Sequence, residues 1–401
     1  MSKAKPSFPS AKDRGALLTE RRNLKMARSA HAYVRGSTAK FYEWLAGGHG
    51  GSLPSGPPAW ICGDCHIGNL GPIANAKGHI EIEIRDLDQT VIGNPAHDLV
   101  RLGLSLASAA RGSDLPGVMT ARMLEQMIDG YQIAFVDKAD ATPVERPEAV
   151  EIALRHALGR KWKELAEERI HDTSPTIPLG KHYWPLTRAE RAAIDALFAD
   201  ERARRLVTAL RQRDDNAAIE VLDAAYWVKG CSSLGNLRCA VLVGINGGKT
   251  RERCLMDVKE AVTALAPRAP KARMPKDNAE RVAEGAWHLS PALGDRLLPA
   301  RLLDRSVFVR ELLPQDLKFE LDHLTPDEAT SVARFLANVV GQAHARQMDD
   351  ALRKSWFNDL QRNRSKTLDA PSWLWTSVVE LLTIHEGAYL EHCRRFAAVA
   401  A

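Results

Sequence analysis

The chain has 401 residues, of which 45% are hydrophobic and 26% are charged, and its formal net charge is +5. These values are typical of a globular protein large enough for two or three structural units. They argue against a nucleic-acid binder, because the charge is small and no basic stripe is interleaved with aromatic residues, and against a membrane protein, because no apolar run approaches about 20 residues.

The predicted elements begin after a loose tail at residues 1–20, which is rich in Lys, Ser and Pro. The tail lacks the apolar core of a secretory signal, so we expect a cytoplasmic protein whose six cysteines are free thiols. Apolar periodicity then predicts, in chain order, a helix at 20–45, a strand at 79–84, helices at 98–110, 120–136, 147–170 and 187–213, strands at 226–228, 239–243 and 255–258, a helix at 278–288, a strand at 306–312, and helices at 326–350 and 371–399. A β-rich island therefore lies between two helical segments.

Three oxygen-bearing side chains around the first predicted strand have the spacing of a phosphoryl-transfer site. Asp64 and Asn69 lie five residues apart on one loop, and Asp86 follows the strand. Phosphoryl transfer from ATP needs one carboxylate to orient the acceptor hydroxyl and two oxygen ligands to hold Mg²⁺ against the phosphates. We therefore assign Asp64 as the catalytic carboxylate, and Asn69 and Asp86 as Mg²⁺ ligands. Each residue alone would suit a turn equally well, and it is the joint spacing that favours the functional interpretation.

The same loop carries a rival pattern. Residues 62–66 read CGDCH, which is the Cys-x-x-Cys-His pattern of c-type haem attachment and could also form a zinc knuckle or a redox pair. Haem attachment needs an exported protein, and a structural zinc site needs a second pair of ligands at similar spacing, which the sequence lacks. We therefore disfavour haem and zinc, and a redox pair only slightly less.

A glycine turn lies between two strands of the β-rich island. Gly230 and Gly235 flank Ser232 and Ser233, and glycines at such a turn let exposed backbone N–H groups cradle phosphates. Lys259 ends a later strand, the place from which a kinase lysine reaches the α- and β-phosphates. We assign these five residues to nucleotide binding. Without the loop at 62–69, a surface hairpin with a solvated lysine would be the default explanation.

The lysine of such a site is usually held by a helical glutamate. Glu284, in the helix that follows, is our candidate partner for Lys259, with Glu280 and Glu260 as alternatives. Residues 307–313 would form the strand that enters the hinge, where backbone groups would meet the adenine.

The loop and its continuation resemble the aminoglycoside and choline-type phosphotransferases. Residues 62–69, CGDCHIGN, are similar to the His-Gly-Asp-x-His-x-x-Asn loop of that family, and residues 86–99, DLDQTVIGNPAHDL, to its metal-binding segment. The resemblance implies that Asp98 stabilises the catalytic loop from a helix start, where Asp is also a good N-cap. Cys62 replaces the usual His of that family, which implies altered support of the loop and unchanged chemistry.

The order of these parts is circularly permuted relative to ordinary kinases, in which the glycine loop and the lysine precede the catalytic loop. Residues 335–346 resemble the helix that normally comes before the catalytic loop, so reading from residue 220 to the end and then back to residue 60 restores the usual order. The chain also resembles a bacterial family called domain of unknown function 2252, over most of residues 20–400. The segments that carry this resemblance are YVRG at 33–36, GDCHIGN at 63–69, DLD at 86–88, GCSSLG at 230–235, VKEA at 258–261, RVAEG at 281–285, VREL at 309–312 and AHAR at 343–346.

These inferences together predict an α+β chain with a protein-kinase-like two-lobe fold in circularly permuted order. The large lobe would be mostly helical and the nucleotide lobe small and β-rich. The expected boundaries are a flexible tail at 1–20, a helical lobe with the catalytic and metal-binding loops at 21–215, a β-rich nucleotide-binding lobe at 216–315, and a helical segment at 316–401 that completes the large lobe.

The function implied is an ATP- and Mg²⁺-dependent phosphotransferase acting on a hydroxyl-bearing acceptor, expected to be a small molecule, with a protein acceptor also open. No nucleic acid or membrane partner is expected. The alternatives on the same fold are a pseudokinase that binds nucleotide without turnover and an enzyme that transfers AMP; a non-catalytic scaffold is the alternative from another class. Arg35 and Arg310 would contact phosphate or an acidic substrate, or would join the two lobes through a salt bridge.

Overall fold

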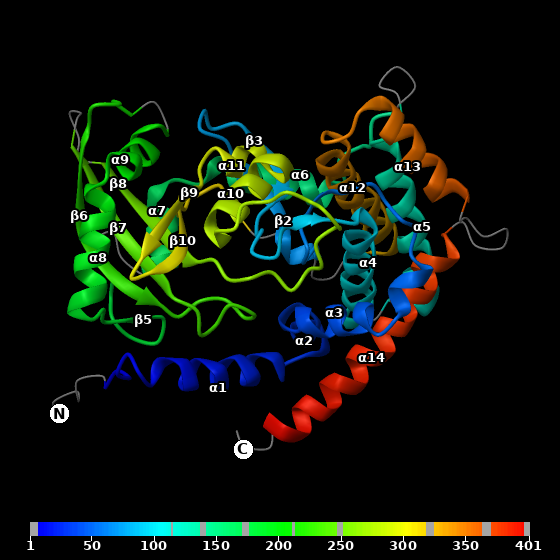
Figure 1. Ribbon diagram of the computed structural model, residues 1–401, viewed down its shortest axis with the longest axis horizontal. Helices are drawn as coiled ribbons and strands as arrows, with labels where there is room; N and C mark the ends of the chain where they lie inside the picture. Colours follow the sequence, from blue (N-terminus) through cyan, green and yellow to red (C-terminus); the bar gives the residue numbers. More distant parts are fainter. Residues whose placement is uncertain are drawn as a thin grey trace.

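The computed structural model of the protein is an α+β fold with an antiparallel sheet at one end and a larger helical part at the other (Figure 1). It describes residues 7–113, 115–136, 142–170, 176–210, 213–246, 252–317, 325–362 and 370–396. The α-helices in these ranges are α1 (Arg14–Met26), α2 (Ala30–Gly36), α3 (Thr38–Ala46), α4 (Pro95–Gly112), α5 (Gly117–Ile133), α6 (Glu148–Gly159), α7 (Trp162–Ile170), α8 (Arg188–Ala199), α9 (Glu201–Thr208), α10 (Asn278–Leu289), α11 (Pro291–Gly294), α12 (Pro326–Ala345), α13 (Asp350–Arg362) and α14 (Ser372–Phe396).

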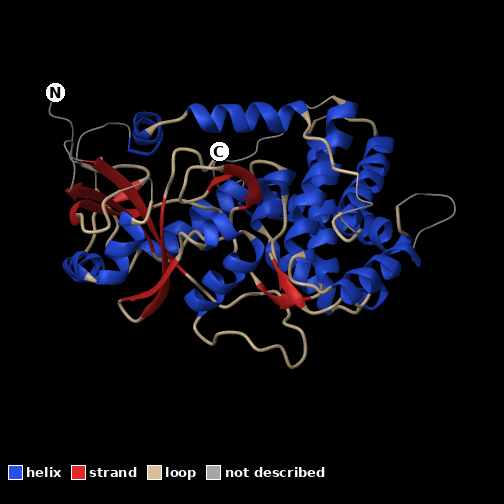
Figure 2. Cartoon of the chain, turned by 90° about the horizontal axis from the view of Figure 1, so that it is seen from above, coloured by secondary structure: helices blue, strands red, loops and turns tan. Residues whose placement is uncertain are grey.

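The strands and the 3-10 turns fill the rest of the framework, and the view in Figure 2 again places most strands at the end opposite the main group of helices. The strands are β1 (Ala59–Ile61), β2 (Leu70–Ala74), β3 (Ile80–Ile84), β4 (Val91–Gly93), β5 (Tyr183–Trp184), β6 (Ala218–Trp227), β7 (Arg238–Asn246), β8 (Glu252–Glu260), β9 (Leu298–Leu302) and β10 (Arg305–Glu311). The 3-10 helices are η1 (His49–Ser52) and η2 (Ile67–Asn69).

The main sheet has six strands in the order β5-β6-β7-β8-β10-β9, and every neighbouring pair is antiparallel. Its central strand β7 is covered on both faces. Val241 and Val243 lie in one core cluster with α8 and α9, whereas Ala240 and Leu242 lie in another with α7. Since side chains alternate between the faces of a strand, burial on both faces explains why β7 reads as a continuous apolar run and not as an alternating pattern.

Two expected boundaries are wrong. Residues 14–20, assigned to a flexible tail, form the first half of α1, and Leu18 is 1% exposed because it packs into the core of the main sheet. Residues 183–208, expected in the helical lobe, supply β5, α8 and α9 to the sheet end. Residues 1–6 of the expected tail lie outside the described part of the chain.

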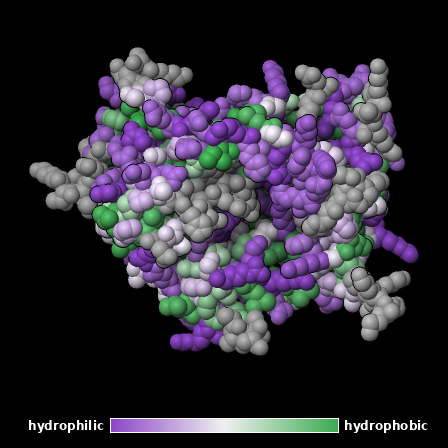
Figure 3. All heavy atoms as spheres, turned by 180° about the vertical axis from the view of Figure 1, so that it is seen from behind, coloured by the Kyte–Doolittle hydropathy of each residue, from purple (hydrophilic) through white to green (hydrophobic). Residues whose placement is uncertain are grey.

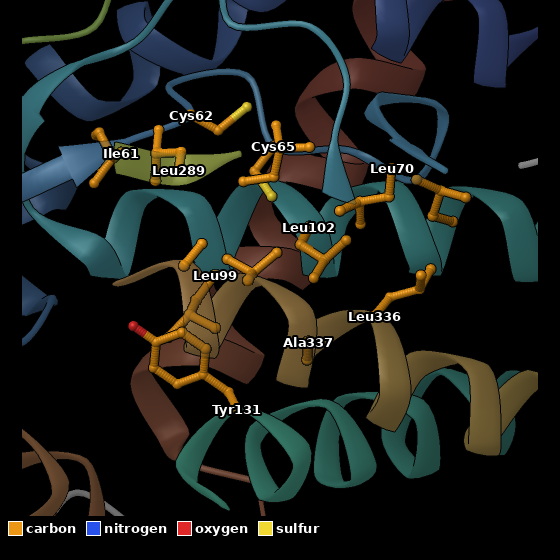
Figure 4. Close-up of a cluster of buried hydrophobic side chains, with 14 of the residues drawn as sticks. Ile61, Cys62, Cys65, Leu70, Leu99, Leu102, Tyr131, Leu289, Leu336 and Ala337 are labelled. Carbon is orange, nitrogen blue, oxygen red and sulfur yellow. The ribbon is translucent and has the colours of Figure 1, made fainter. Parts of the chain in front are cut away.

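The helical part is built around α4, which packs against α2, α5, α12 and α14. Leu99 and Leu102 of α4 lie in one cluster with Tyr131 of α5 and Leu336 of α12 (Figure 4). Because neighbours surround α4, almost all of its residues are buried, including two charged ones that lie on the same side of the helix three residues apart, Asp98 and Arg101. Buried charges of this kind need partners.

Two small antiparallel sheets set the positions of the predicted site residues. β1 pairs with β4, and β2 pairs with β3 with Leu70 opposite Ile84. This pairing brings the residue before β2, Asn69, beside the segment after β3, and the Arg85 N–H donates to the Asn69 carbonyl at 2.7 Å. Asn69 and Asp86, 17 positions apart in the sequence, therefore lie at the same end of one hairpin.

Hydrophilic residues cover most of the face drawn in Figure 3, and apolar residues occur there in small groups. No described helix combines the length and the apolar composition that a membrane span requires.

Candidate active site

The loop at residues 62–69, which is predicted to carry the catalytic aspartate, leaves β1 through a turn that only glycine fits. Gly63 has a φ of +74°, and a Cβ at this position would lie 2.2 Å from the Gln89 carbonyl oxygen. A positive φ is accessible to glycine without steric cost. The Tyr42 hydroxyl donates a hydrogen bond to the Gly63 carbonyl and fixes the turn from the side of α3.

Asp98 supports this loop directly. Its Oδ2 accepts from the Cys62 N–H at 2.7 Å and its Oδ1 from the Gly63 N–H at 2.9 Å, which is the supporting role that the resemblance implied. The expectation that Asp98 caps the helix is wrong. Asn94 is the N-cap of α4, and its side chain accepts from the Ala96 N–H, so Asp98 lies in the first turn and is left to hold the loop.

The Asp64 side chain is held at both oxygens. Arg101 Nε donates to Oδ1 at 2.9 Å, and the Thr38 hydroxyl donates to Oδ2 at 2.9 Å. Burial raises the pKa of Asp64, although the Arg101 charge and the Thr38 hydrogen bond oppose the rise. The carboxylate therefore has a fixed orientation and a higher affinity for a proton than a solvated aspartate.

Asn69 and Asp86, the two expected metal ligands, would supply only part of the coordination shell of a metal ion. Asn69 Nδ2 donates to the Asp64 carbonyl at 2.9 Å, which leaves the Asn69 Oδ1 available. Within the described residues, no three His, Cys, Asp or Glu side chains cluster so as to hold a metal ion by themselves. Mg²⁺ is usually held by one or two protein oxygens together with substrate phosphates and water, so Asn69 and Asp86 fit Mg²⁺ that arrives with a nucleotide.

Lys259 is buried between two carboxylates. Its Nζ lies 3.2 Å and 3.4 Å from the two Asp86 oxygens and also forms an ion pair with Asp88. Burial raises the pKa of Asp86, but Lys259 and then Arg310 lower it, and the net pKa lies well below its usual range. Burial and the Asp86 charge raise the pKa of Asp88 to about 6. Lys259 therefore positions the segment that carries Asp86.

The expected partner of Lys259, Glu284, is not its partner. Val282 and Ala286 on α10 are buried, and Glu284, two residues from each, is exposed on the other side of the helix. The buried charge on α10 is Arg281, which donates to the backbone carbonyls of the loop between β3 and β4. The face of α10 that packs on the core therefore carries Arg281, and Asp86 and Asp88 take the place expected for the glutamate.

The glycine turn joins β6 to β7. Gly230 and Gly235 both have a φ of +109°, which fits the requirement for glycine at the two ends of the turn. Lys25 of α1 donates to the Gly230 carbonyl at 2.8 Å, so the N-terminal helix contacts the turn. The exposed Ser232 and the half-buried Ser233 lie between the glycines.

Two adjoining chambers meet at the predicted site. The first, which reaches residues 312–313 after β10 and is called the hinge chamber below, has a volume of about 270 Å³. The second chamber has a volume of about 250 Å³. The residues that line both are Asp64, Asn69, Asp86, Ser232 and Ser233. Gly230 lines the hinge chamber alone, whereas Gly235, Lys259 and Glu284 line neither of these two. The fold thus brings residues of the loop at 62–69, Asp86 and the turn at 230–235 together where the two chambers meet.

A family model described as "Uncharacterized protein conserved in bacteria (DUF2252)" matches residues 14–395. The chain belongs to the DUF2252 family. Comparisons with curated proteins and with solved structures give no match. Membership of DUF2252 confirms the resemblance seen in the sequence segments and names no substrate.

Sequence reasoning missed several residues that complete the site of this DUF2252 protein. Thr38 and Arg101 hold Asp64, and the only signal for Arg101 was a charged residue three positions after Asp98 in an apolar helix. Arg35 and Arg310, which the sequence did single out, both line the hinge chamber. Arg310 also donates to the Asp257 carboxylate of β8 at 3.3 Å and to the Arg85 carbonyl at 3.1 Å, so it joins the main sheet to the hairpin of β2 and β3.

Proposed function

We propose that this DUF2252 protein is an ATP- and Mg²⁺-dependent phosphotransferase with a protein-kinase-like fold in circularly permuted order. The observation that carries the proposal is the convergence of the loop at 62–69 and the turn at 230–235 on one pair of chambers. A purely structural protein would not require an oxygen-bearing loop and a glycine turn so far apart in the sequence to meet at one cavity. The scaffold alternative leaves this convergence unexplained.

The sheet topology supports the proposal. The glycine turn joins β6 and β7, and Lys259 lies on the next strand, β8, opposite Arg238 of β7 and Phe308 of β10. In protein kinases the glycine-rich loop covers the phosphates and the lysine lies on the third strand. Counted from β6, this chain has the same order, followed by α10 and the two remaining strands, β9 and β10.

The residues divide the chemical work in the proposed reaction. Asp64, oriented by Arg101 and Thr38, accepts the proton of the acceptor hydroxyl. Asn69 and Asp86 would hold Mg²⁺, and the bound ion would neutralise negative charge on the phosphates. The backbone N–H groups of the turn at 230–235 would hold phosphate oxygens, and Lys259 keeps Asp86 in place through its ion pair.

Thermal unfolding with and without ATP and Mg²⁺ tests the proposal. A ligand at 100 times its dissociation constant stabilises a protein by about 2.7 kcal/mol, so the wild type should melt at a clearly higher temperature with both ligands. Asp86→Ala should lose the part of the shift that depends on Mg²⁺. A wild type whose melting temperature no nucleotide changes, with or without metal, would refute the proposal.

A further inference from the structure

The hinge chamber is lined by more cations than carboxylates. Apart from the exposed Lys25, its cationic lining consists of Arg35, Arg85, Arg169, Lys229, Arg238 and Arg310. The lining carboxylates are Asp64, Asp86 and Asp316, and each already pairs with a cation that does not line the chamber: Arg101 at 2.9 Å, Lys259 at 3.2 Å and Arg296 at 3.0 Å. Among the lining cations, Arg169 pairs with Glu168, and Arg238 and Arg310 share Asp257. Arg35, Arg85 and Lys229 have no ion-pair partner among the described residues, so the chamber keeps an excess of positive charge.

Several of these cations lack a full set of partners. Among the described residues, the buried Nε–H groups of Arg35, Arg85 and Arg169 have no acceptor. Lys229 lies over the Trp227 ring, 4.1 Å from its centroid. Burial, and then the charges of Arg238 and Arg169, lower the pKa of Lys229 well below its usual range. A bound anion would relieve this repulsion.

The same chamber is poorly suited to a nucleobase. Its wall contains the Arg238–Asp257–Arg310 network, in which Asp257 is fully buried and accepts from Arg238 at 2.8 Å and 2.5 Å. At the hinge, the Leu312 N–H donates to the Leu255 carbonyl at 2.9 Å, and the Leu313 N–H points at Asp316 Oδ2 at 3.4 Å. The next residue is a proline, which has no N–H. An adenine at this place would meet guanidinium groups and engaged backbone donors.

The second chamber has the opposite character. Beyond the residues shared with the hinge chamber, its lining consists mainly of small, apolar and amide side chains, such as Ala39, Val262, Leu265 and Gln89. Among the described residues that line it, Arg22 is the one cation. Its carboxylates are Asp64, which pairs with Arg101, and Asp86 and Asp88, which pair with Lys259. The second chamber therefore offers a polyanion little positive charge, and its lining suits an uncharged nucleoside and a hydroxyl-bearing acceptor.

We propose that the hinge chamber binds the two terminal phosphates of a nucleoside triphosphate, so that the α-phosphorus lies at Asn69 and Asp86 and the group transferred is a nucleoside monophosphate. This inference rests on the proposed function and selects nucleotidyl over phosphoryl transfer. The acceptor oxygen forms a bond to the α-phosphorus while its proton passes to Asp64. The bond between the α-phosphorus and the oxygen that leads to the β-phosphorus breaks, and its electron pair leaves with pyrophosphate, which stays among the arginines.

Binding of inorganic tripolyphosphate tests the inference without knowledge of the acceptor. Isothermal titration calorimetry of the full chain with Mg²⁺ should give tripolyphosphate a dissociation constant within about tenfold of that of ATP, and adenosine should bind far more weakly. Lys229→Gln, which breaks no ion pair among the described residues, and Arg310→Gln should each weaken tripolyphosphate by about tenfold or more. Arg305→Gln, an exposed arginine on the same strand as Arg310, is the matched control and should leave binding unchanged.

The failure of this inference differs from the failure of the proposed function. If ATP and adenosine bind but tripolyphosphate does not, the phosphates lie elsewhere and the inference is overturned while the phosphotransferase proposal stands. If neither ATP nor tripolyphosphate binds, both are overturned. With ATP labelled at the α- or the γ-phosphate, turnover that releases pyrophosphate and transfers the α-label supports the inference, and turnover that yields ADP contradicts it.

Discussion

His344 Nε2 lies 3.2 Å from Asp98 Oδ2, although the two residues are 246 positions apart. The chain of contacts continues outward: the Tyr131 hydroxyl lies 2.9 Å from His344 Nδ1, and Trp356 Nε1 donates to that hydroxyl at 3.2 Å. Because Asp98 accepts both backbone N–H groups at the start of the loop at 62–69, this network connects α5, α12 and α13 to the loop through α4. The helical part therefore acts as the support of the site.

The His344 contact predicts a specific loss of stability. His344→Phe keeps the size of the ring but leaves an Asp98 oxygen and the Tyr131 hydroxyl with one partner fewer, which should cost about 1–3 kcal/mol in free energy of unfolding. Urea denaturation measures the loss. His79→Phe, at an exposed site, is the control and should change stability by less than about 0.5 kcal/mol. Equal losses for the two variants would show that the network does not stabilise the loop.

The ion pair between Arg101 and Asp64 leads us to expect that Asp64 is needed for stability as well as for turnover. Arg101 is fully buried, so Asp64→Ala leaves an uncompensated buried charge and should cost about 3–5 kcal/mol in free energy of unfolding. The double variant Asp64→Asn/Arg101→Gln removes both charges and should recover most of this stability without recovering turnover. A double variant as unstable as Asp64→Ala would contradict the pairing, and one with wild-type turnover would contradict the catalytic assignment.

Two glycines separate the effect of a close contact from that of backbone strain. Gly63 and Gly78 both have a positive φ, +74° and +85°, but an added Cβ meets the Gln89 carbonyl only at Gly63 and open space at Gly78. Gly78→Ala should therefore cost only the strain of about 1 kcal/mol. Gly63→Ala should cost clearly more and should reduce turnover. Equal costs in chemical denaturation would mean that the turn at Gly63 relaxes without consequence.

The raised pKa of Asp88 leads us to expect a pH-dependent contribution of this residue to stability. Its pKa of about 6 lies above the value of about 4 for an unfolded aspartate, so the folded state binds the proton more tightly. The contribution of Asp88 to stability is therefore fully present below about pH 4 and is lost as the pH rises through about 6. The free energy of unfolding of the wild type minus that of Asp88→Asn should fall between these pH values. A difference that stays constant across the range would contradict the raised pKa.

The sequence was most informative where neighbours in the chain remain neighbours in space. Asp64, Asn69 and Asp86 come together because one loop and one hairpin carry them, and the glycines at 230 and 235 mark a turn that the fold confirms. It failed where partners come from distant elements. Glu284 suited the usual lysine partner by type, but which face of α10 is buried depends on packing against other segments, and no local pattern indicates that Lys259 meets Asp88.

Contacts between distant elements also explain why the sequence did not predict the helix at residues 14–20 or the cationic lining of the hinge chamber. The Lys, Ser and Pro residues that suggest a loose tail all lie before residue 14. That residues 14–20 form a helix follows from the main sheet, whose core buries Leu18. The arginines of the hinge chamber come from α2, α7, β7, β10 and the segment after β3. These arginines lie in separate stretches of the sequence, and the fold brings their charges together.

The most direct test of the central claim is nucleotide-dependent metal binding, followed by electron paramagnetic resonance with Mn²⁺ in place of Mg²⁺. Since Asn69 and Asp86 supply only part of a coordination shell and phosphates supply more, ATP should tighten Mn²⁺ binding to the wild type by about tenfold or more. Asp86→Ala and Asn69→Ala should abolish that effect, and Asp316→Ala, which removes another carboxylate from the lining of the hinge chamber, should retain it. Mn²⁺ binding that is the same with and without ATP, or that is unchanged in Asp86→Ala, would contradict the account.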